Sequence, residues 1–148
     1  MVESIFKDFG VAASLSLAAA GSALGTGAAA MGAIGAWKKC YAQNKTAPFL
    51  LAAFVGFPLS QTIYGMILMG QIAQAAAQGH ILMGLGIFGG LGIGASAMMQ
   101  GRAAAGACDA LAETGKGTGN YILALGIIES VALFVMVFLL IQIGPLTQ

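Results

Sequence analysis

Charged residues divide this chain into four long apolar segments, near 9–37, 47–77, 80–112 and 118–145. Each segment is long enough to cross about 30 Å of hydrocarbon as a single helix. The connections between them, WKKCYAQNKTAP, AQGH and AETGKGT, are short and polar, so consecutive helices form antiparallel pairs. The pattern predicts an all-α integral membrane protein made of two fused transmembrane hairpins, residues 1–78 and 79–148.

Composition supports lipid as the solvent. Hydrophobic residues make up 59% of the chain and charged residues 7%, whereas a soluble domain carries about 25% charged residues. Six Lys and Arg balance five Asp and Glu, so no basic stripe is available for a nucleic acid. Cys40 and Cys108 are too few for a disulfide framework or a zinc site, and we interpret them as small apolar filler. Glu3, Lys7 and Asp8 make the N-terminus a poor signal peptide, and we expect no cleavage.

Glycines concentrate in the first and third apolar segments. The first contains Gly21-xxx-Gly25, and the third contains Gly86-xxx-Gly90-xxx-Gly94. Because backbone groups in lipid must bond within their own helix, such glycines predict close helix contact rather than loops. The second and fourth segments instead carry bulky side chains, which predict an outer, lipid-facing layer: Phe49, Phe54, Phe57, Tyr64, Phe134 and Phe138.

The two hairpins resemble each other. A shift of 67 residues matches Gly and Ala positions of 25–31 to those of 92–98, and a shift of 70 matches Ser60 to Ser130. This similarity indicates an ancestral hairpin that was duplicated and fused. In the second register Glu129 lies opposite Leu59, so only the second hairpin has a membrane carboxylate.

Lysines predict the orientation. Lys38, Lys39, Lys45 and Lys116 lie in or beside the first and third connections, and the second connection has no Lys or Arg. Basic loops remain cytoplasmic in most membrane proteins. We therefore expect both lysine-bearing loops in the cytoplasm and both termini on the opposite side, although Lys7 runs against this rule.

Glu129 is the main candidate for chemistry. It lies in NYILALGIIESVALFVMVFLL, with no other charged residue within ten positions on either side. An ionised carboxylate at this depth costs at least about 2.5–3.5 kcal/mol. Acids retained inside a membrane usually mark a path for ions or protons. The alternative is a protonated side chain that only bonds a neighbouring helix.

The second segment presents a polar face that could meet this acid. Phe57, Ser60, Gln61 and Tyr64 follow the i, i+3, i+4, i+7 spacing of one helical face. Pro58 lies within it, removes one helical hydrogen bond and can leave carbonyl oxygens available for a cation. Without a partner, the same face would be simple polar contact between helices.

Depth brings a third segment into the same site. Gln61, Gln100 and Glu129 each lie about 16–21 Å from the cytoplasmic ends of their predicted helices. A carboxylate, two amide oxygens, a hydroxyl and a backbone carbonyl are hard ligands that suit Na⁺ better than a bare proton. Tyr64 is placed to donate its hydroxyl to the carboxylate. Arg102, about 200° around the helix from Gln100, is expected to face another surface.

The motifs FPLSQTIYG, MMQGRAAAG and IIES, in this order and spacing, resemble the four-helix membrane rotor subunit of V-type ATPases. The resemblance to this proteolipid c or K subunit is closest for the bacterial Na⁺-transporting kind. It implies that Glu129 is the ion-binding carboxylate, that Gln61 and Gln100 coordinate Na⁺, and that Tyr64 bonds the acid. It also implies ligands from the Ser60 hydroxyl, where Thr is expected, and from the Phe57 backbone carbonyl.

The resemblance further implies a closed ring of identical subunits in the cell membrane. The first and third helices would line its inside, a membrane stator subunit would supply an arginine, and the central stalk would dock on the cytoplasmic loops. The subunit itself would catalyse nothing. The same rotor role with H⁺ is the first alternative. A small cation-coupled multidrug transporter is another, but it needs an aromatic-lined cavity, and a purely structural oligomer leaves the shared depth of the polar groups unexplained.

Overall fold

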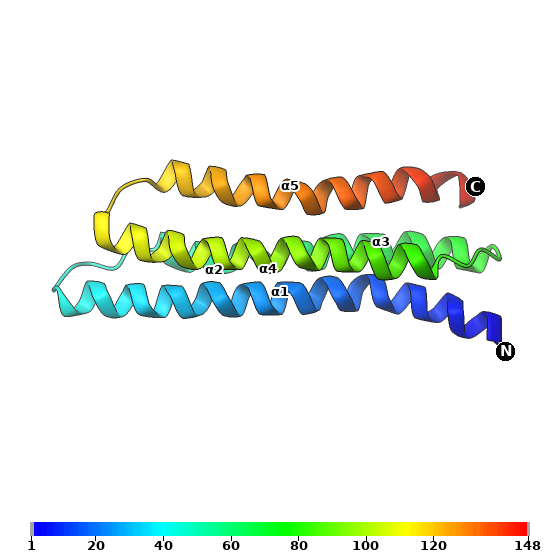
Figure 1. Cartoon of the computed structure of the whole chain (residues 1–148), viewed down its shortest axis with the longest axis horizontal. Helices are drawn as coiled ribbons and strands as arrows, with labels where there is room; N and C mark the ends of the chain where they lie inside the picture. The colour runs from blue at the N-terminus through cyan, green and yellow to red at the C-terminus, as the bar shows by residue number, and fades with distance from the viewer. Residues whose placement is uncertain (1, 148) are drawn as a thin grey trace.

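The computed structural model describes residues 2–147, and these form helices joined by short connections (Figure 1). No strand occurs within this described part, which confirms the predicted all-α fold. Four helical segments are long and apolar enough to cross a membrane, and they indicate a multi-pass membrane protein. The elements are α1 (Val2–Ala42), α2 (Leu50–Gly56), the 3₁₀ turn η1 (Phe57–Leu59), α3 (Ser60–Ala77), α4 (Met83–Thr114), α5 (Thr118–Ile143) and the 3₁₀ turn η2 (Gly144–Leu146).

The helices run side by side, with both termini and the α3–α4 turn at one end (Figure 1). The α1–α2 connection and the α4–α5 turn lie together at the other end. Helix α4 contacts α1, α3 and α5, whereas α5 packs mainly on α4 and α3. The arrangement makes α1 and α4 one close pair, beside which α3 and α5 meet.

The helix bounds differ from the predicted segments. Helix α1 is longer than the predicted 9–37, because its polar ends continue the helix past the apolar stretch. The second segment begins at Leu50 rather than near 47, since Pro48 disfavours helical backbone at the residue before it. Helix α4 begins at Met83 rather than near 80, after a turn in which Gly79 has a φ of +100°.

The second membrane segment is interrupted where Pro58 lies. Pro58 has no N–H to donate, so the chain tightens into the 3₁₀ turn Phe57–Leu59 between α2 and α3. The interruption predicted from the proline is confirmed. Ser60, the first residue of α3, follows it directly and so begins the polar face of that helix.

Glycines bring the backbones of α1 and α4 into contact. A Cβ atom on Gly21 would collide with the backbone carbonyl oxygen of Gly94. One on Gly101 would collide in the same way with the carbonyl oxygen of Gly25. No side chain fits at either position, so the predicted close contact between these two glycine-rich helices is confirmed.

The bulky side chains of the second segment do not all face outward. Phe134 and Phe138 on α5 are 59% and 61% exposed, as expected for a lipid-facing layer. Phe54 is fully buried, so its predicted outward orientation is wrong. It belongs to the same buried cluster as Ala29 and Ala33 of α1. Tyr64 and Phe57 are half-buried.

The cysteines belong to the same core cluster as Phe54. Cys40 and Cys108 are both free and both buried. The Cys108 thiol approaches the backbone carbonyl of Leu51 at 3.8 Å, a weak contact within the core. Their interpretation as small apolar filler agrees with this packing.

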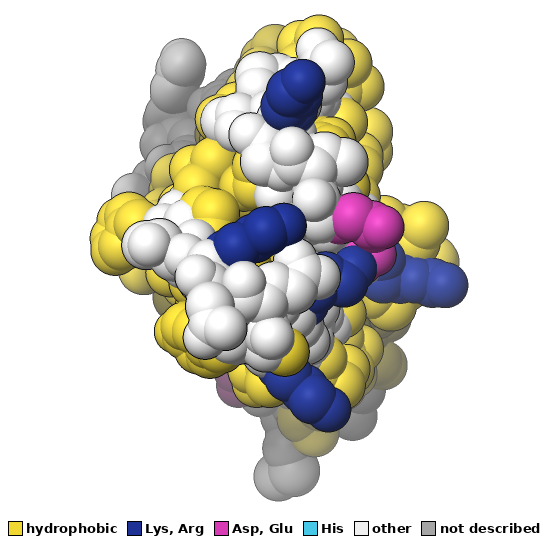
Figure 2. All heavy atoms as spheres, turned by 90° about the vertical axis from the view of Figure 1, so that its left-hand side faces the viewer, with side chains coloured by type: hydrophobic (Ala, Val, Ile, Leu, Met, Phe, Trp, Pro, Cys, Tyr) yellow, Lys and Arg dark blue, Asp and Glu magenta, His cyan; other side chains and the backbone are white. Residues whose placement is uncertain are grey.

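Basic side chains gather at the end of the molecule that carries the α1–α2 connection (Figure 2). Lys39 on α1 donates to Asp109 at 3.0 Å and to Glu113 at 3.2 Å, both on α4. This cluster ties the close helix pair together at its polar end. Three further lysines belong to this end of the molecule: Lys38, Lys45 and Lys116.

Candidate functional site

Glu129 lies on α5 and faces the first turns of α3. The Tyr64 hydroxyl donates to Glu129 Oε1 at 2.8 Å. The Ser60 hydroxyl donates to the same oxygen at 2.5 Å. Two residues one turn apart on α3 therefore hold a single carboxylate oxygen. The side chain of Glu129 is half-buried in the single chain.

Gln61 and Gln100 are both fully buried behind the carboxylate. Gln61 Nε2 donates to Gln100 Oε1 at 2.9 Å. Gln100 Nε2 in turn donates to the backbone carbonyl of Leu125 at 3.0 Å and approaches Glu129 Oε2 at 3.4 Å. Side chains from three membrane segments thus form one connected network around the acid.

Several oxygens converge on the Ser60 hydroxyl. Its Oγ lies 2.5 Å from Glu129 Oε1, 3.1 Å from the Phe57 carbonyl oxygen and 3.2 Å from Gln61 Oε1. A hydroxyl carries one proton, so it can donate to only one of these three acceptors at a time. The three acceptor oxygens all lie within 3.2 Å of Ser60 Oγ, close enough together to serve as ligands of one ion.

The charge of the site limits what it can hold. Glu129 supplies one negative charge, and the other oxygens of the network are neutral. In the described residues no group of three His, Cys, Asp or Glu side chains could hold a metal ion. Hard oxygens with a single carboxylate suit a hard monovalent cation or a proton rather than zinc or calcium.

The local sequence explains why these groups meet. Gln61, Gln100 and Glu129 each lie about 16–21 Å into their helical segments. The depth is counted from Leu50, Thr114 and Thr118, which lie at the end of the molecule with the α1–α2 and α4–α5 connections. The 3₁₀ turn sets the start of α3, and the helical period then aligns Ser60 with Tyr64. The structure therefore brings together every residue that the sequence placed at the site.

Sequence reasoning missed one side chain beside the network. The Ser96 hydroxyl on α4 donates to the backbone carbonyl of Ile128 at 2.8 Å. Ile128 precedes Glu129 directly. Ser96 lies one helical turn from Gln100, and this spacing was the signal that could have pointed to it. Nothing else in the sequence distinguishes this serine, because it lies among Ala and Gly and its acceptor is a backbone carbonyl.

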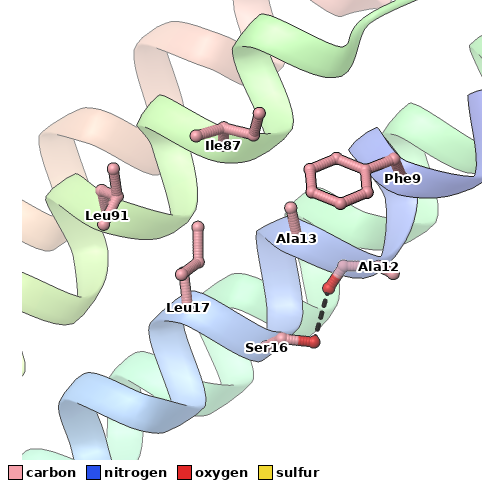
Figure 3. Close-up of a pocket in the computed structure, with 7 residues that line it drawn as sticks. All are labelled: Phe9, Ala12, Ala13, Ser16, Leu17, Ile87 and Leu91. Carbon is pink, nitrogen blue, oxygen red and sulfur yellow. Dashed lines mark hydrogen bonds between the residues drawn. The ribbon is translucent and has the colours of Figure 1, made fainter. Parts of the chain in front are cut away.

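Two other features lie away from the carboxylate. Arg102 is exposed and forms no hydrogen bond or ion pair with the described residues, so it stands outside the network. A groove of about 430 Å³ opens between α1 and α4 (Figure 3). The one hydroxyl in its lining, that of Ser16, already donates to the carbonyl of Ala12, which leaves an apolar groove without an ion ligand. It is lined by Phe9, Ala12, Ala13, Ser16, Leu17, Ile87 and Leu91.

Comparison with known families gives one match. Residues 83–142 match the family model of the ATP synthase C subunit. The matched region spans α4 and nearly all of α5, and therefore includes Gln100 and Glu129. It covers less than half of the chain and does not extend to the first hairpin. No curated protein matches this sequence.

Proposed function

We propose that this chain is the ion-carrying rotor subunit of a V-type ATPase and that it binds Na⁺ at Glu129. The observation that carries the proposal is the lone membrane carboxylate, which Ser60 and Tyr64 bond from a neighbouring helix. The match of residues 83–142 to the C subunit of ATP synthase supports a rotor role for the hairpin that contains this carboxylate.

Charge neutralisation is the physical basis of the carrier. An ionised Glu129 facing lipid is costly, whereas the same carboxylate with a bound monovalent cation has no net charge. The loaded subunit can then pass through lipid as the rotor turns. Near the stator, an arginine of a partner subunit replaces the cation and releases it to water. Each unit charge moved against 100 mV costs about 2.3 kcal/mol, which ATP hydrolysis in a separate soluble head supplies.

The oxygens around Ser60 favour Na⁺ over a proton. A cation among Phe57 O, Ser60 Oγ, Gln61 Oε1 and Glu129 Oε1 would have four oxygen ligands that already lie close together. Gln100 Oε1 accepts a bond from Gln61 but has a second lone pair, so it too can turn to the ion. With H⁺ as the coupling ion, a protonated Glu129 would need only the Ser60 oxygen, and the two buried amides would have no ligand role.

The rotor proposal includes an assembly. Identical subunits would form a closed ring in the cell membrane, with α1 and α4 inside and α3 and α5 toward lipid. The exposed phenylalanines of α5 agree with a lipid-facing outer layer. The basic end would lie in the cytoplasm, where the central stalk docks on the two loops. The subunit itself would catalyse no reaction.

A small multidrug transporter is the competing function. Such a carrier needs a cavity with aromatic side chains beside its acid to bind an organic cation. The network around Glu129 offers amides and hydroxyls instead, and one tyrosine whose hydroxyl is bonded to the acid. The donor set therefore favours a small inorganic ion.

Labelling of Glu129 with a hydrophobic carbodiimide tests the proposal. The reagent reacts with a protonated carboxyl group within the membrane, so bound Na⁺ should protect Glu129 and K⁺ should protect it poorly. The Glu129→Gln variant is the control that must lose the label. If protection depends on pH alone and not on Na⁺, the coupling ion is H⁺ and the proposed rotor role stands. A wild-type chain in which Glu129 takes no label at any pH would overturn the proposal.

A further inference from the structure

Two side chains of α4 donate hydrogen bonds to the backbone of α5. Ser96 donates to the carbonyl of Ile128 at 2.8 Å, and Gln100 donates to that of Leu125 at 3.0 Å. The two donors are one turn apart on α4, and the two acceptors are one turn apart on α5. Each acceptor has a second lone pair, so it can take such a bond in addition to its helical bond.

Two such bonds restrain a helix more than one bond does. A single contact leaves α5 free to pivot about it, whereas two contacts one turn apart fix both its rotation and its axial position against α4. A rotation of about 20° would move a carboxylate about 6 Å from the helix axis by roughly 2 Å. That displacement would separate Glu129 Oε1 from both the Ser60 and the Tyr64 hydroxyls.

Burial makes the Ser96 bond part of the packed interior. Ser96 is 6% exposed, and Gly92, one turn away on the same helix, lies beside Val135 of α5, where a Cβ would be at ordinary contact distance. The close approach of α4 and α5 at Gly92 allows a side chain as short as serine to reach across to the Ile128 carbonyl.

We infer that Ser96 is a positioning residue for the ion site. Its hydroxyl holds the α5 backbone next to Glu129, so that the carboxylate stays directed toward Ser60 and Tyr64. Ser96 does not touch the ion. The inference rests on the proposed ion-carrying function, because it concerns how tightly that same site binds.

A serine on α5 itself provides a matched control. Ser130 is next to Glu129 in the chain, but its hydroxyl donates at 3.0 Å to Gly126 of its own helix. Removing it loses one hydrogen bond near the acid without releasing α5 from α4. A general effect of serine loss near the acid would appear in both positions, whereas a positioning effect would appear at Ser96 alone.

The test compares Ser96→Val with Ser96→Thr, which have nearly the same shape and differ in the hydroxyl. In the full chain purified in its native assembly, carbodiimide labelling of Glu129 is titrated with Na⁺ at fixed pH and with pH in the absence of Na⁺. Loss of one positioning hydrogen bond should raise the concentration of Na⁺ for half-protection about threefold to tenfold in Ser96→Val. Ser96→Thr and Ser130→Ala should stay within about twofold of the wild type.

The outcomes separate this inference from the rotor proposal. Equal half-protection in Ser96→Val and Ser96→Thr, with normal wild-type protection, would overturn the positioning role alone. A wild-type chain in which Glu129 is never labelled would overturn both. If Ser96→Val fails to assemble, Ser96→Ala is compared with Ser130→Ala instead. Equal Na⁺ concentrations for half-protection in these two variants would refute the inference. If H⁺ is the ion, the same comparison is made on the pH of half-labelling.

Discussion

Tyr64→Phe is the cleanest test of the ion binding proposed for Glu129. The substitution removes one oxygen, the hydroxyl that donates to Glu129 Oε1 at 2.8 Å, and leaves the ring in place. Ser60 still donates to the same carboxylate oxygen, so the acid keeps one of its two bonds from α3. The change therefore isolates a single interaction.

The expected magnitude follows from the charge of the acceptor. A hydrogen bond to an ionised group contributes about 1.5–3 kcal/mol, more than one between neutral groups. Ser60 still donates to the same carboxylate oxygen, so part of the stabilisation remains and the lower end of that range applies. Ion affinity should then fall about tenfold, since about 1.4 kcal/mol is a factor of ten.

Ion-dependent ATPase activity of the proposed V-type ATPase, assembled with this subunit, measures this effect. The Na⁺ concentration for half-maximal activity should rise about tenfold in Tyr64→Phe, with the maximal rate little changed. Tyr121→Phe is the control, because Tyr121 packs edge-on against Phe54 at 6.4 Å and its hydroxyl makes no hydrogen bond within the described part of the chain. Equal Na⁺ dependence in Tyr64→Phe and Tyr121→Phe would refute the idea that the Tyr64 bond holds the acid for the ion.

Further variants address the amides, the acid and the helix contact. Gln61→Ala or Gln100→Ala should raise the half-maximal Na⁺ concentration roughly tenfold to a hundredfold while ring assembly persists, and unchanged Na⁺ dependence in both would defeat the coordination model. In the same assay, Glu129→Gln should abolish coupled transport, because it removes the charge that balances the ion. Gly101→Leu should separate α1 from α4, where a Cβ already meets the Gly25 carbonyl oxygen, and cost about 1–3 kcal/mol or more. Particle size in detergent reports this loss, and a normal particle would contradict the packing argument.

Much of the site followed from two periodicities of the sequence. The helical spacing placed Ser60 and Tyr64 on one face, and the rise per residue placed Gln61, Gln100 and Glu129 at one depth. Both quantities are properties of a single helix, so they need no knowledge of packing. The glycine ridges were informative for the same reason, since a missing side chain on one face has few uses in lipid other than close contact.

What the sequence could not predict depends on how helices pack. Phe54 is a residue type that is common on lipid-facing helices, and only the packed fold places it in a buried cluster with alanines of α1. Ser96 bonds a backbone carbonyl, and no residue type marks such an acceptor in a sequence. The hydrogen bond between Gln61 and Gln100 depends on the orientation of both side-chain amides, and this orientation is determined by all the groups around them.

The backbone contact between α1 and α4 also determines which part of the molecule is stiff. Carbonyl oxygens of one helix lie where the other has no side chain, so no layer of rotatable groups separates the two. Where the two backbones meet directly, at Gly21 and at Gly101, small motions between α1 and α4 have no intervening side chain to absorb them. Movement is easier for α5, because its outer face has no neighbour among the described helices. The side chains that join it to α3, Ser60 and Tyr64, can also move. For the ion-carrying function proposed above, an ion would enter or leave Glu129 through movement of α5, with the α1–α4 pair as a fixed support.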